Sequence, residues 1–394
     1  MRAFIDEWKH LLSGKILFII VLVPIVVAAA FGYIFKNSQI NEAPIAVVDL
    51  DHSVYSKQLI SKLDASQYVQ VQRVFENEIE ADLLLYNEEF LAVVYLPVGL
   101  EANRLQGKQS NIGFYVDNTL AQATGNLRTG VTEVITAENA ALAAGSLKGL
   151  GLTDSQVTGM TSSMMLQQRA LYNPTNSTMM SSVIGFVNTI MVSLLGSSAL
   201  SIVPRLRAEG RLNNELDRPM GIFVRVIPYA IVGCVSYILS IGLLKQVGGL
   251  RFEAGMLQMI IPLLLFTLSL GLLSMVIGWT APNPQKASGR IIFLILPSFL
   301  LSGAQLPIAL LPGPLQTVSK LLPLTWHFKF MRGMGYKGGE LRYFIPELGV
   351  FLVLLSGLAA ILFILILMEK RKLSKEQVKA EDTLMHSQES LVQS

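Results

Sequence analysis

The chain has 394 residues, of which 52% are hydrophobic and only 15% are charged. Average soluble domains carry about 25% charged residues, so this composition argues against a soluble enzyme, a disordered chain and a nucleic-acid binder. The formal net charge of +3 is too small to indicate a nucleic-acid partner. A single cysteine, Cys234, excludes an internal disulfide framework and a cysteine-based metal site, and the four scattered histidines have no ligand spacing.

Segment 1–13 has the pattern of an amphipathic helix. Its apolar residues fall on one helical face, and they are Phe4, Ile5, Trp8, Leu11 and Leu12. Tryptophan and basic residues at this place are typical of a helix that lies in the inner membrane interface, which is the prediction for 1–13. A plain extension of the first membrane span is the alternative.

Six segments are predicted to cross the membrane, because a bilayer core takes about 20 apolar residues per helix. The first lies within 14–36 and has no charged residue after Lys15 until Lys36. Its apolar run continues past the alanines at 28–30, which favours an uncleaved helix over a secretory signal. The other five lie within 178–368, at 179–203, 221–244, 256–280, 289–310 and 345–368.

The charges that flank these spans predict the orientation of the chain. With the N-terminus inside, the inside segments are 1–15, 204–219, 281–290 and the tail 369–394, and they carry 14 Lys and Arg residues. The short outside loops carry 7, most of them in loop 312–344. Lysine and arginine concentrate on the cytoplasmic side of membrane proteins, so both termini are predicted to be cytoplasmic.

Residues 37–177 form a polar block between the first two spans and are predicted to fold as an extracytoplasmic α/β domain. The block holds 15 Asp and Glu residues against 8 Lys and Arg residues, and about 140 residues can bury an independent core. Its acidity suits either a cationic substrate or ordinary solubility. The pattern predicts strands at 44–49, 68–74, 90–96 and 112–117, and helices that start at Ser53 and cover 76–85 and 119–148.

Catalytic and cofactor motifs are absent from the sequence. It contains no GxxxxGK[ST], HExxH, CxxC or GxSxG pattern. Asp49 and Asp51, one residue apart at the end of a predicted strand, offer too few oxygen ligands for a metal ion and are expected to form a turn. The chain is therefore predicted to be no enzyme, to hold no metal and to bind no ATP itself.

Three stretches resemble the ABC-2 type transporter permeases. Loop 205–219 has an acidic residue and a glycine before a short helix and a proline that opens the next span. The matching residues are Glu209, Gly210, Leu212, Leu216 and Pro219. The usual Thr and Glu of this motif are here Arg211 and Asn213. Stretch 297–326 resembles the last outside segment of the family, and 45–53 resembles the start of a large domain after the first span.

This resemblance implies the permease subunit of an ABC exporter in the bacterial inner membrane. The implied fold is an α-helical polytopic membrane protein with six transmembrane helices and an inserted α/β extracytoplasmic domain. In such exporters two permease copies or paralogues form the pathway, and a separate ATPase subunit with ATP and Mg²⁺ binds the inner face. Members with a large outside domain are linked to efflux of drugs or other small molecules, in some cases with a periplasmic adaptor protein.

Loop 204–219 is predicted to contain a coupling helix that docks in a groove of the ATPase. Its side chains mix charge signs at helical spacing around a flexible glycine. The predicted coupling residues are Arg207, Glu209, Gly210, Arg211, Leu212 and Glu215. The alternative is a solvated basic loop that only fixes topology.

Small and hydroxyl residues recur along the second span, and such a face lets membrane helices pack closely. Together with two residues of the fifth span, they are predicted to line the translocation path or a dimer seam. These residues are Ser181, Gly185, Asn188, Thr189, Ser193, Ser197, Ser302 and Gln305. Packing within one chain is the alternative. Arg225, inside the third predicted span, is expected to snorkel to the inner interface rather than to bind substrate.

Two other classes of function stay open. A membrane-anchored receptor or assembly scaffold would bind a partner through its outside domain, but it would not need the acidic residue and glycine of loop 204–219. An ion-driven secondary transporter should carry ionisable residues at mid-membrane. The second, fourth, fifth and sixth predicted spans show none there.

Overall fold

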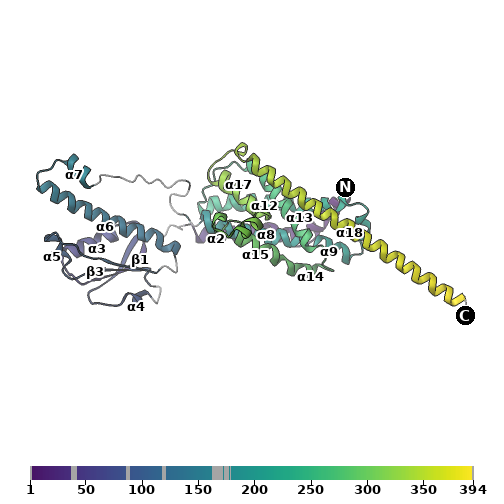
Figure 1. Cartoon of the computed structure of the whole chain (residues 1–394), viewed down its shortest axis with the longest axis horizontal. Coiled ribbons are helices and arrows are strands. Elements are labelled where there is room, and N and C mark those ends of the chain that lie inside the picture. Colours follow the sequence, from purple (N-terminus) through teal and green to yellow (C-terminus); the bar gives the residue numbers. More distant parts are fainter. Residues whose placement is uncertain are drawn as a thin grey trace. The chain divides into compact units, whose positions relative to one another are not determined.

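The computed structural model describes residues 2–36, 42–85, 89–117, 121–161, 172, 177 and 179–392. The chain divides into two compact units, which are described separately (Figure 1). The membrane unit comprises Met1–Ser38 and Leu171–Ser394, and the α/β unit comprises Gln39–Ala170.

Long apolar helices make up the membrane unit. They are α2 (Ile16–Ile34), α8 (Ile184–Leu200), α12 (Val226–Gly248), α13 (Met256–Gly278) and α18 (Ile345–Val392). With adjoining helical residues, five segments of the described chain are long and apolar enough to cross a membrane, namely Ile16–Ile34, Ile184–Ala208, Met220–Gly248, Leu257–Gly278 and Leu341–Lys375. These helices have the length and composition of a polytopic membrane protein, as the sequence predicted.

The predicted span at 289–310 does not form one long helix. Its helical part, η3 (Gly289–Ile291) and α15 (Ile292–Leu301), follows directly on α14 (Pro284–Ser288) and ends nine residues before the predicted span does. The helix ends because Gly303 takes a left-handed conformation, with a φ of +82°, and Pro307 then holds an extended backbone. The sixth crossing expected from the sequence is therefore not confirmed, since hydropathy reports apolar character but not the path of the backbone.

The predicted outside loop at 312–344 is folded. Short helices fill it and the segment before it, namely η3 (Gly289–Ile291), η4 (Ile308–Leu310), α16 (Gly313–Lys320), α17 (Pro323–Phe330), η5 (Met331–Tyr336) and η6 (Leu341–Phe344). α17 is almost wholly buried and packs against α13 and α18. Its His327 is fully buried, with Nε2 2.8 Å from the hydroxyl of Tyr237 on α12. This segment therefore belongs to the core of the membrane unit.

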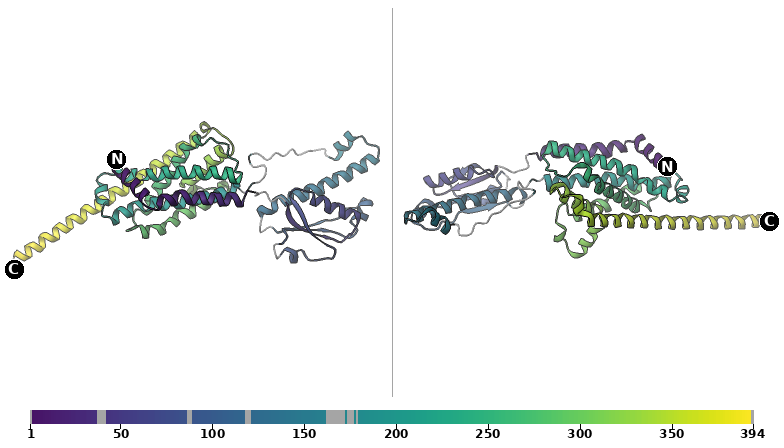
Figure 2. Two further views of the ribbon diagram at one scale, coloured as in Figure 1. Left: turned by 180° about the vertical axis from the view of Figure 1, so that it is seen from behind. Right: turned by 90° about the horizontal axis from the view of Figure 1, so that it is seen from above.

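α13 is a central helix of the membrane unit. It packs against α8, α12, α17 and α18, while α2 packs along α12 and α8 (Figures 1 and 2). The outward faces of α2, α15 and α18 leave large apolar side chains exposed, among them Phe18 at 68%, Phe293 at 69% and Val353 at 71%. Exposed apolar surface of this kind is suited to contact with lipid.

A four-stranded mixed sheet, counted within the described residues, is the frame of the α/β unit. Its strands are β1 (Ala43–Asp49), β2 (Val69–Phe75), β3 (Ala92–Leu96) and β4 (Gly113–Val116). Their order is β2-β1-β3-β4, with β1 parallel to both neighbours and β4 antiparallel to β3. Because β1 is central and buried on both faces, its sequence is a continuous apolar run rather than an alternating one.

Helices cover both faces of this sheet. They are α3 (Val54–Asp64), α4 (Ala81–Leu85), α5 (Leu100–Leu105), α6 (Ala121–Gly149) and α7 (Asp154–Thr161). α3, α5 and α6 bury apolar side chains against one face, and α4 covers part of the other. The helix predicted at 76–85 begins only at Ala81, so the acidic residues before it are not helical.

The end of β1 confirms the two local predictions made for it. The Ser53 hydroxyl oxygen accepts a hydrogen bond from the Ser56 backbone N–H at 3.0 Å, as an N-cap does. The Asp49 carboxylate accepts from the backbone N–H groups of Asp51 and His52, both at 3.1 Å, and from the Ser56 hydroxyl at 2.7 Å. All these contacts shape the turn, so Asp49 has a structural role.

The α/β unit is expected to fold without the rest of the chain. It has its own buried clusters on both faces of the sheet, and a core of this size can stabilise an independent domain. Residues 40–176, produced alone, should therefore unfold in one cooperative transition when circular dichroism is followed against temperature. A gradual, non-cooperative melt would show that this unit depends on the membrane helices.

Candidate functional site

The predicted coupling loop at 204–219 is a chain of short helices. They are α9 (Ile202–Ala208), α10 (Leu212–Leu216) and α11 (Met220–Val224). Glu209, Gly210 and Arg211 form the turn between α9 and α10, which is called the coupling turn below. Gly210 has a φ of +69°, a left-handed conformation that glycine adopts without steric cost. Glycine is therefore favoured at this turn between α9 and α10.

Three of the six predicted coupling residues hold this turn in place through contacts with the rest of the membrane unit. Arg207 donates hydrogen bonds to the backbone carbonyls of Trp279 and Ala281, at 2.7 and 2.5 Å, and to the Glu369 carboxylate of α18 at 3.1 Å. It thereby satisfies carbonyls at the C-terminal end of α13, which a helix cannot satisfy itself. Leu212 is buried at 3% exposure. The third anchoring residue, Glu215, belongs to the buried cluster described below.

The other three predicted coupling residues form the exposed surface. The side chains of Glu209 and Arg211 are 41% and 45% exposed, and their charged atoms lie 3.3 Å apart. Gly210 is exposed between them. Arg211 also pairs at 2.8 Å with Asp6 of α1 (Arg2–Ser13), the N-terminal amphipathic helix. Exposed ion pairs contribute under about 1 kcal/mol each, so contacts with another protein can replace them at little cost.

A buried ion-pair cluster lies beneath the coupling turn. Glu7 of α1 is fully buried; its two oxygens accept hydrogen bonds from Arg205, from Tyr229 at 2.7 Å and from Arg225 at 2.8 Å. The same Arg225 donates to Glu215 at 2.6 Å. The cluster therefore joins α1, α9, α10 and α12 through charged side chains.

Glu7 is ionised in this setting. Burial by itself raises the pKa of its carboxyl, but the charge of Arg205 and the hydrogen bonds from Arg205, Arg225 and Tyr229 outweigh burial. The pKa of Glu7 therefore lies below its ordinary value. Two arginines thus face two carboxylates, Glu7 and Glu215, and their charges balance.

The structure corrects the expectation for Arg225. The side chain does not snorkel to an interface: it is 1% exposed, and both of its terminal nitrogens are paired with carboxylates. Sequence reasoning also missed its partner Glu7, although one signal was present. Glu7 is three residues after Phe4 and four before Leu11, so an acidic residue occupies the apolar face of α1. A charge on an apolar face indicates a buried partner.

The structure places part of the predicted stripe on α8 against α15. Gly185 lies beside the turn that follows α15, and a Cβ at this position would be 3.2 Å from Nε2 of Gln305. Gly196, which neighbours the stripe about three turns further along α8, is packed in the same way, because a Cβ there would be 2.9 Å from Leu294 of α15. This side of the stripe packs within the chain, which was the alternative interpretation.

The remaining stripe residues divide by exposure. Asn188 is fully buried and donates to the Ile184 carbonyl of its own helix at 2.8 Å, and Ser302 is also fully buried. The half-buried residues are Thr189, Ser193 and Ser197. The side chain of Ser181 lies outside the described residues. The half-buried hydroxyls are the part of the stripe that a path or a dimer seam would use.

The fold and the charged hairpin define a class, a polytopic helical membrane protein, and comparison with known proteins gives the family. A model described as ABC-2 family transporter protein matches residues 15–368, and the chain therefore belongs to the ABC-2 family. It is 23% identical over 367 residues to the inner membrane transport permease YhhJ of Escherichia coli (strain K12). The aligned residues cover 89% of this chain and 91% of YhhJ. YhhJ of Shigella flexneri matches with the same values.

Family membership confirms the resemblance seen in the sequence. ABC-2 permeases are membrane components of transporters and are not themselves catalytic. They work in general with an ABC ATPase partner. This chain is therefore a permease component of a transporter in a membrane.

Proposed function

We propose that this chain is the pathway-forming subunit of an ATP-driven exporter in the bacterial inner membrane and that a separate ATPase drives it through the coupling turn. The observation that carries the proposal is the contrast within one hairpin: Glu209, Gly210 and Arg211 are exposed, whereas Arg207, Leu212 and Glu215 are anchored. A firmly held, exposed pair of opposite charges is suited to docking on a protein partner.

The anchoring contacts supply a route for movement. A displacement of the coupling turn acts through Arg207 on the end of α13 and on α18. It acts through Glu215 and Arg225 on α12, and through Glu7 on α1. Packed helices linked by ion pairs move together because their interfaces resist continuous deformation. The chain thus transmits a push at one hairpin to the membrane helices that form the pathway.

The proposed pathway is completed by a second permease, either a copy of this chain or a paralogue. The half-buried hydroxyls of α8 would face this second subunit or the path. The cargo is a drug or another small amphipathic molecule, handed in some systems to a periplasmic adaptor. ATP and Mg²⁺ bind on the ATPase, because this sequence has no phosphate-binding loop. Both termini are cytoplasmic, as the flanking charges indicate.

Reversing the charge of the coupling turn is expected to uncouple the transporter. Glu209→Lys adds a positive charge on the proposed cytoplasmic side, so insertion stays favourable. It should repel the basic group that Glu209 meets on the ATPase, and a charge reversal in an interface costs about a few kcal/mol. Co-purification with the cognate ATPase and ATP-dependent transport into everted membrane vesicles should both fall at least tenfold, with normal abundance of the permease.

Two further variants separate docking from local structure. Glu209→Gln removes the same exposed ion pairs with Arg205 and Arg211 without reversing the charge, and it should retain most of the complex. Gly210→Pro cannot adopt the φ of +69° and should lose the complex by deforming the turn. If Glu209→Lys and Gly210→Pro both retain wild-type complex formation and export, the hairpin only connects two spans and the proposed docking role is wrong.

A further inference from the structure

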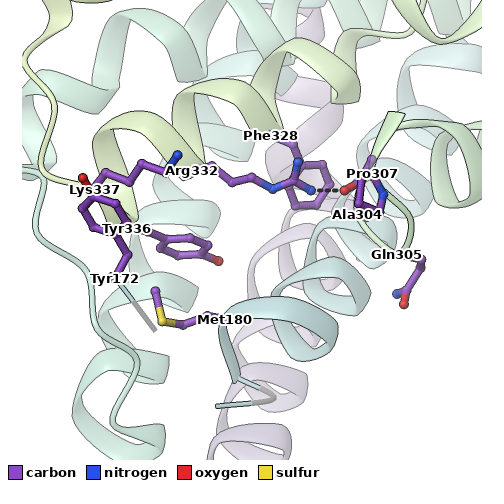
Figure 3. A pocket seen from close by; sticks show the side chains of 10 residues that line it. Tyr172, Met180, Ala304, Gln305, Pro307, Phe328, Arg332, Tyr336 and Lys337 are labelled. Carbon is purple, nitrogen blue, oxygen red and sulfur yellow. Dashed lines mark hydrogen bonds between the residues drawn. The ribbon is translucent and has the colours of Figure 1, made fainter. Parts of the chain in front are cut away.

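A cavity of about 360 Å³ opens in the membrane unit between η2 (Met179–Val183), the turn after α15 and the segment 328–337 (Figure 3). Met180, Phe328 and Pro307 give it apolar walls, while Arg332, Tyr336 and Lys337 give it polar groups. The volume lies within the range of about 300–1,000 Å³ that is usual for small-molecule sites. It is distinct from the coupling turn, because its residues come from the segments 172–180 and 303–337.

The charge of this cavity is positive. Arg332 and Lys337 line it, and no Asp or Glu is among the described residues that line it. Arg332 forms no ion pair with a described carboxylate; it donates to the Gly303 carbonyl oxygen and lies over the Phe328 ring, 5.6 Å from the centroid. These two contacts fix the position of the guanidinium without neutralising it. A half-buried cation without a counter-charge favours the entry of an anion.

A second, independent feature also indicates a ligand. Tyr336 is only 7% exposed, and its hydroxyl has no hydrogen-bond partner among the described residues. Buried tyrosine hydroxyls normally find a partner, because an unpaired one costs free energy. Figure 3 shows this hydroxyl between Met180 and Arg332, at the space they both line. A ligand oxygen there would accept hydrogen bonds from Tyr336 and Arg332 together.

We propose that this cavity binds an amphipathic organic anion, whose negative group meets Arg332 and Tyr336 and whose apolar part lies along Phe328 and Met180. The inference rests on the proposed function, since it assigns the chemical class of the cargo. Lys337, whose ammonium lies 5.5 Å from the Tyr172 ring centroid, adds a second cation near the entrance. The same positive charge disfavours cationic amphiphiles, which gives the site its selectivity.

Binding to the full-length permease in nanodiscs of phosphatidylcholine tests this assignment. The probe is 11-(dansylamino)undecanoic acid, and its primary amide is the uncharged control. The fluorescence titration should give a Kd for the acid at least tenfold below that for the amide, because a hydrogen-bonded charge pair contributes about 1.5–3 kcal/mol. Arg332→Gln should abolish this preference, Arg332→Lys should restore part of it, and Tyr336→Phe should weaken acid binding severalfold.

The segment 312–344, which contains Arg332, also contains a matched control residue. Arg342 is an exposed arginine paired with Glu340 and does not line the cavity, so Arg342→Gln should bind the acid as the wild type does. Gel filtration must show the same elution profile for all variants, and Arg332→Lys guards against loss of binding through misfolding. Equal binding of acid and amide by the wild type, or acid binding by Arg332→Gln at the wild-type level, would overturn the assignment.

The same titration shows whether the bound anion is a lipid headgroup or a free amphiphile. If phosphatidylglycerol in the nanodisc displaces the acid, the anionic group is a lipid headgroup; if it does not, the ligand is a free amphiphile. Both outcomes retain an anion at Arg332. The binding assay contains no ATPase, so its outcome does not depend on the proposed function. If the permease exports but binds acid and amide equally well, only the assigned cargo class is refuted. If it prefers the acid but forms no complex with an ATPase, only the proposed coupling is refuted.

Discussion

Replacing Glu7 with glutamine is expected to lower the free energy of unfolding by about 3–5 kcal/mol, because removing one partner of a buried ion pair leaves the other charge uncompensated. The carboxylate of Glu7 is fully buried and accepts from both Arg205 and Arg225. Arg225 is 1% exposed, and without the Glu7 carboxylate the two arginines would have Glu215 as the one remaining carboxylate among the four charged residues of the cluster. The substitution should also loosen α1 from α12, since this contact joins them.

The chain contains its own reporter for this measurement. Cys234, the single cysteine, is 8% exposed in α12, so its reaction with a maleimide dye during heating in detergent follows unfolding. The matched control is Asp6→Asn, which removes the neighbouring carboxylate from an exposed pair with Arg211 and should change stability by less than about 1 kcal/mol. Equal transition temperatures for the two variants would contradict a buried role for Glu7.

The pH dependence provides a second check of the same residue. Because the pKa of Glu7 is lowered in the folded protein, the carboxylate stabilises the fold above its unfolded pKa, and this contribution is lost as the pH falls through the folded value. The folded value lies below the ordinary 4.5. The stability difference between wild type and Glu7→Gln should therefore be constant near neutral pH and shrink below pH 4.5.

Replacing Gly278 with alanine is expected to destabilise the protein by about 3 kcal/mol, at the upper end for overpacked cores. A Cβ at this position of α13 would be 2.2 Å from the Leu200 carbonyl oxygen, at the end of α8. The obstacle is backbone, which no rotamer change can remove, so α13 and α8 must separate. This crossing lies next to Trp279, whose carbonyl binds Arg207, so export should fall as well.

Gly242 is the matched control for this substitution. It is also a helix-interior glycine, in α12, but a Cβ there meets nothing within 4 Å. Alanine is favoured over glycine in a helix by about 1 kcal/mol, so Gly242→Ala should keep or raise the temperature at which Cys234 becomes reactive. If Gly278→Ala behaves like Gly242→Ala, the two backbones do not approach this closely.

Local patterns predicted much of the fold. The four strands of the α/β unit were visible as short apolar or alternating runs, and the Ser53 cap was visible from its residue type alone. Hydropathy found α2, α8, α12, α13 and α18 because long apolar runs need no partner to be recognised. It did not reveal the end of α15, where Gly303 and Pro307 stop the helix inside an apolar segment, because composition averages over such positions.

The candidate site was predictable only in part. Mixed charges and Gly210 indicated the coupling turn, since both are local features. The anchoring of Arg207 and the pairing of Glu7 with Arg225 were not predictable, because residues 218 positions apart in the chain meet only after the helices pack. The same reason hides the cavity at Arg332, whose lining comes from segments on both sides of α12 and α13.

The ion pairs at the end of the α18 span also set how this helix is turned about its axis. Glu369 binds Arg207, and Lys370 binds Asp217, while α18 continues from Pro346 without another proline. Each residue of an α-helix turns the chain by about 100°. One added or deleted residue between 347 and 368 would thus carry Glu369 away from Arg207, whereas a change of seven residues, nearly two turns, would keep its direction and shift it by about 10 Å. Either change would therefore separate Glu369 from Arg207, so these ion pairs fix both the rotation of α18 and its position along its own axis.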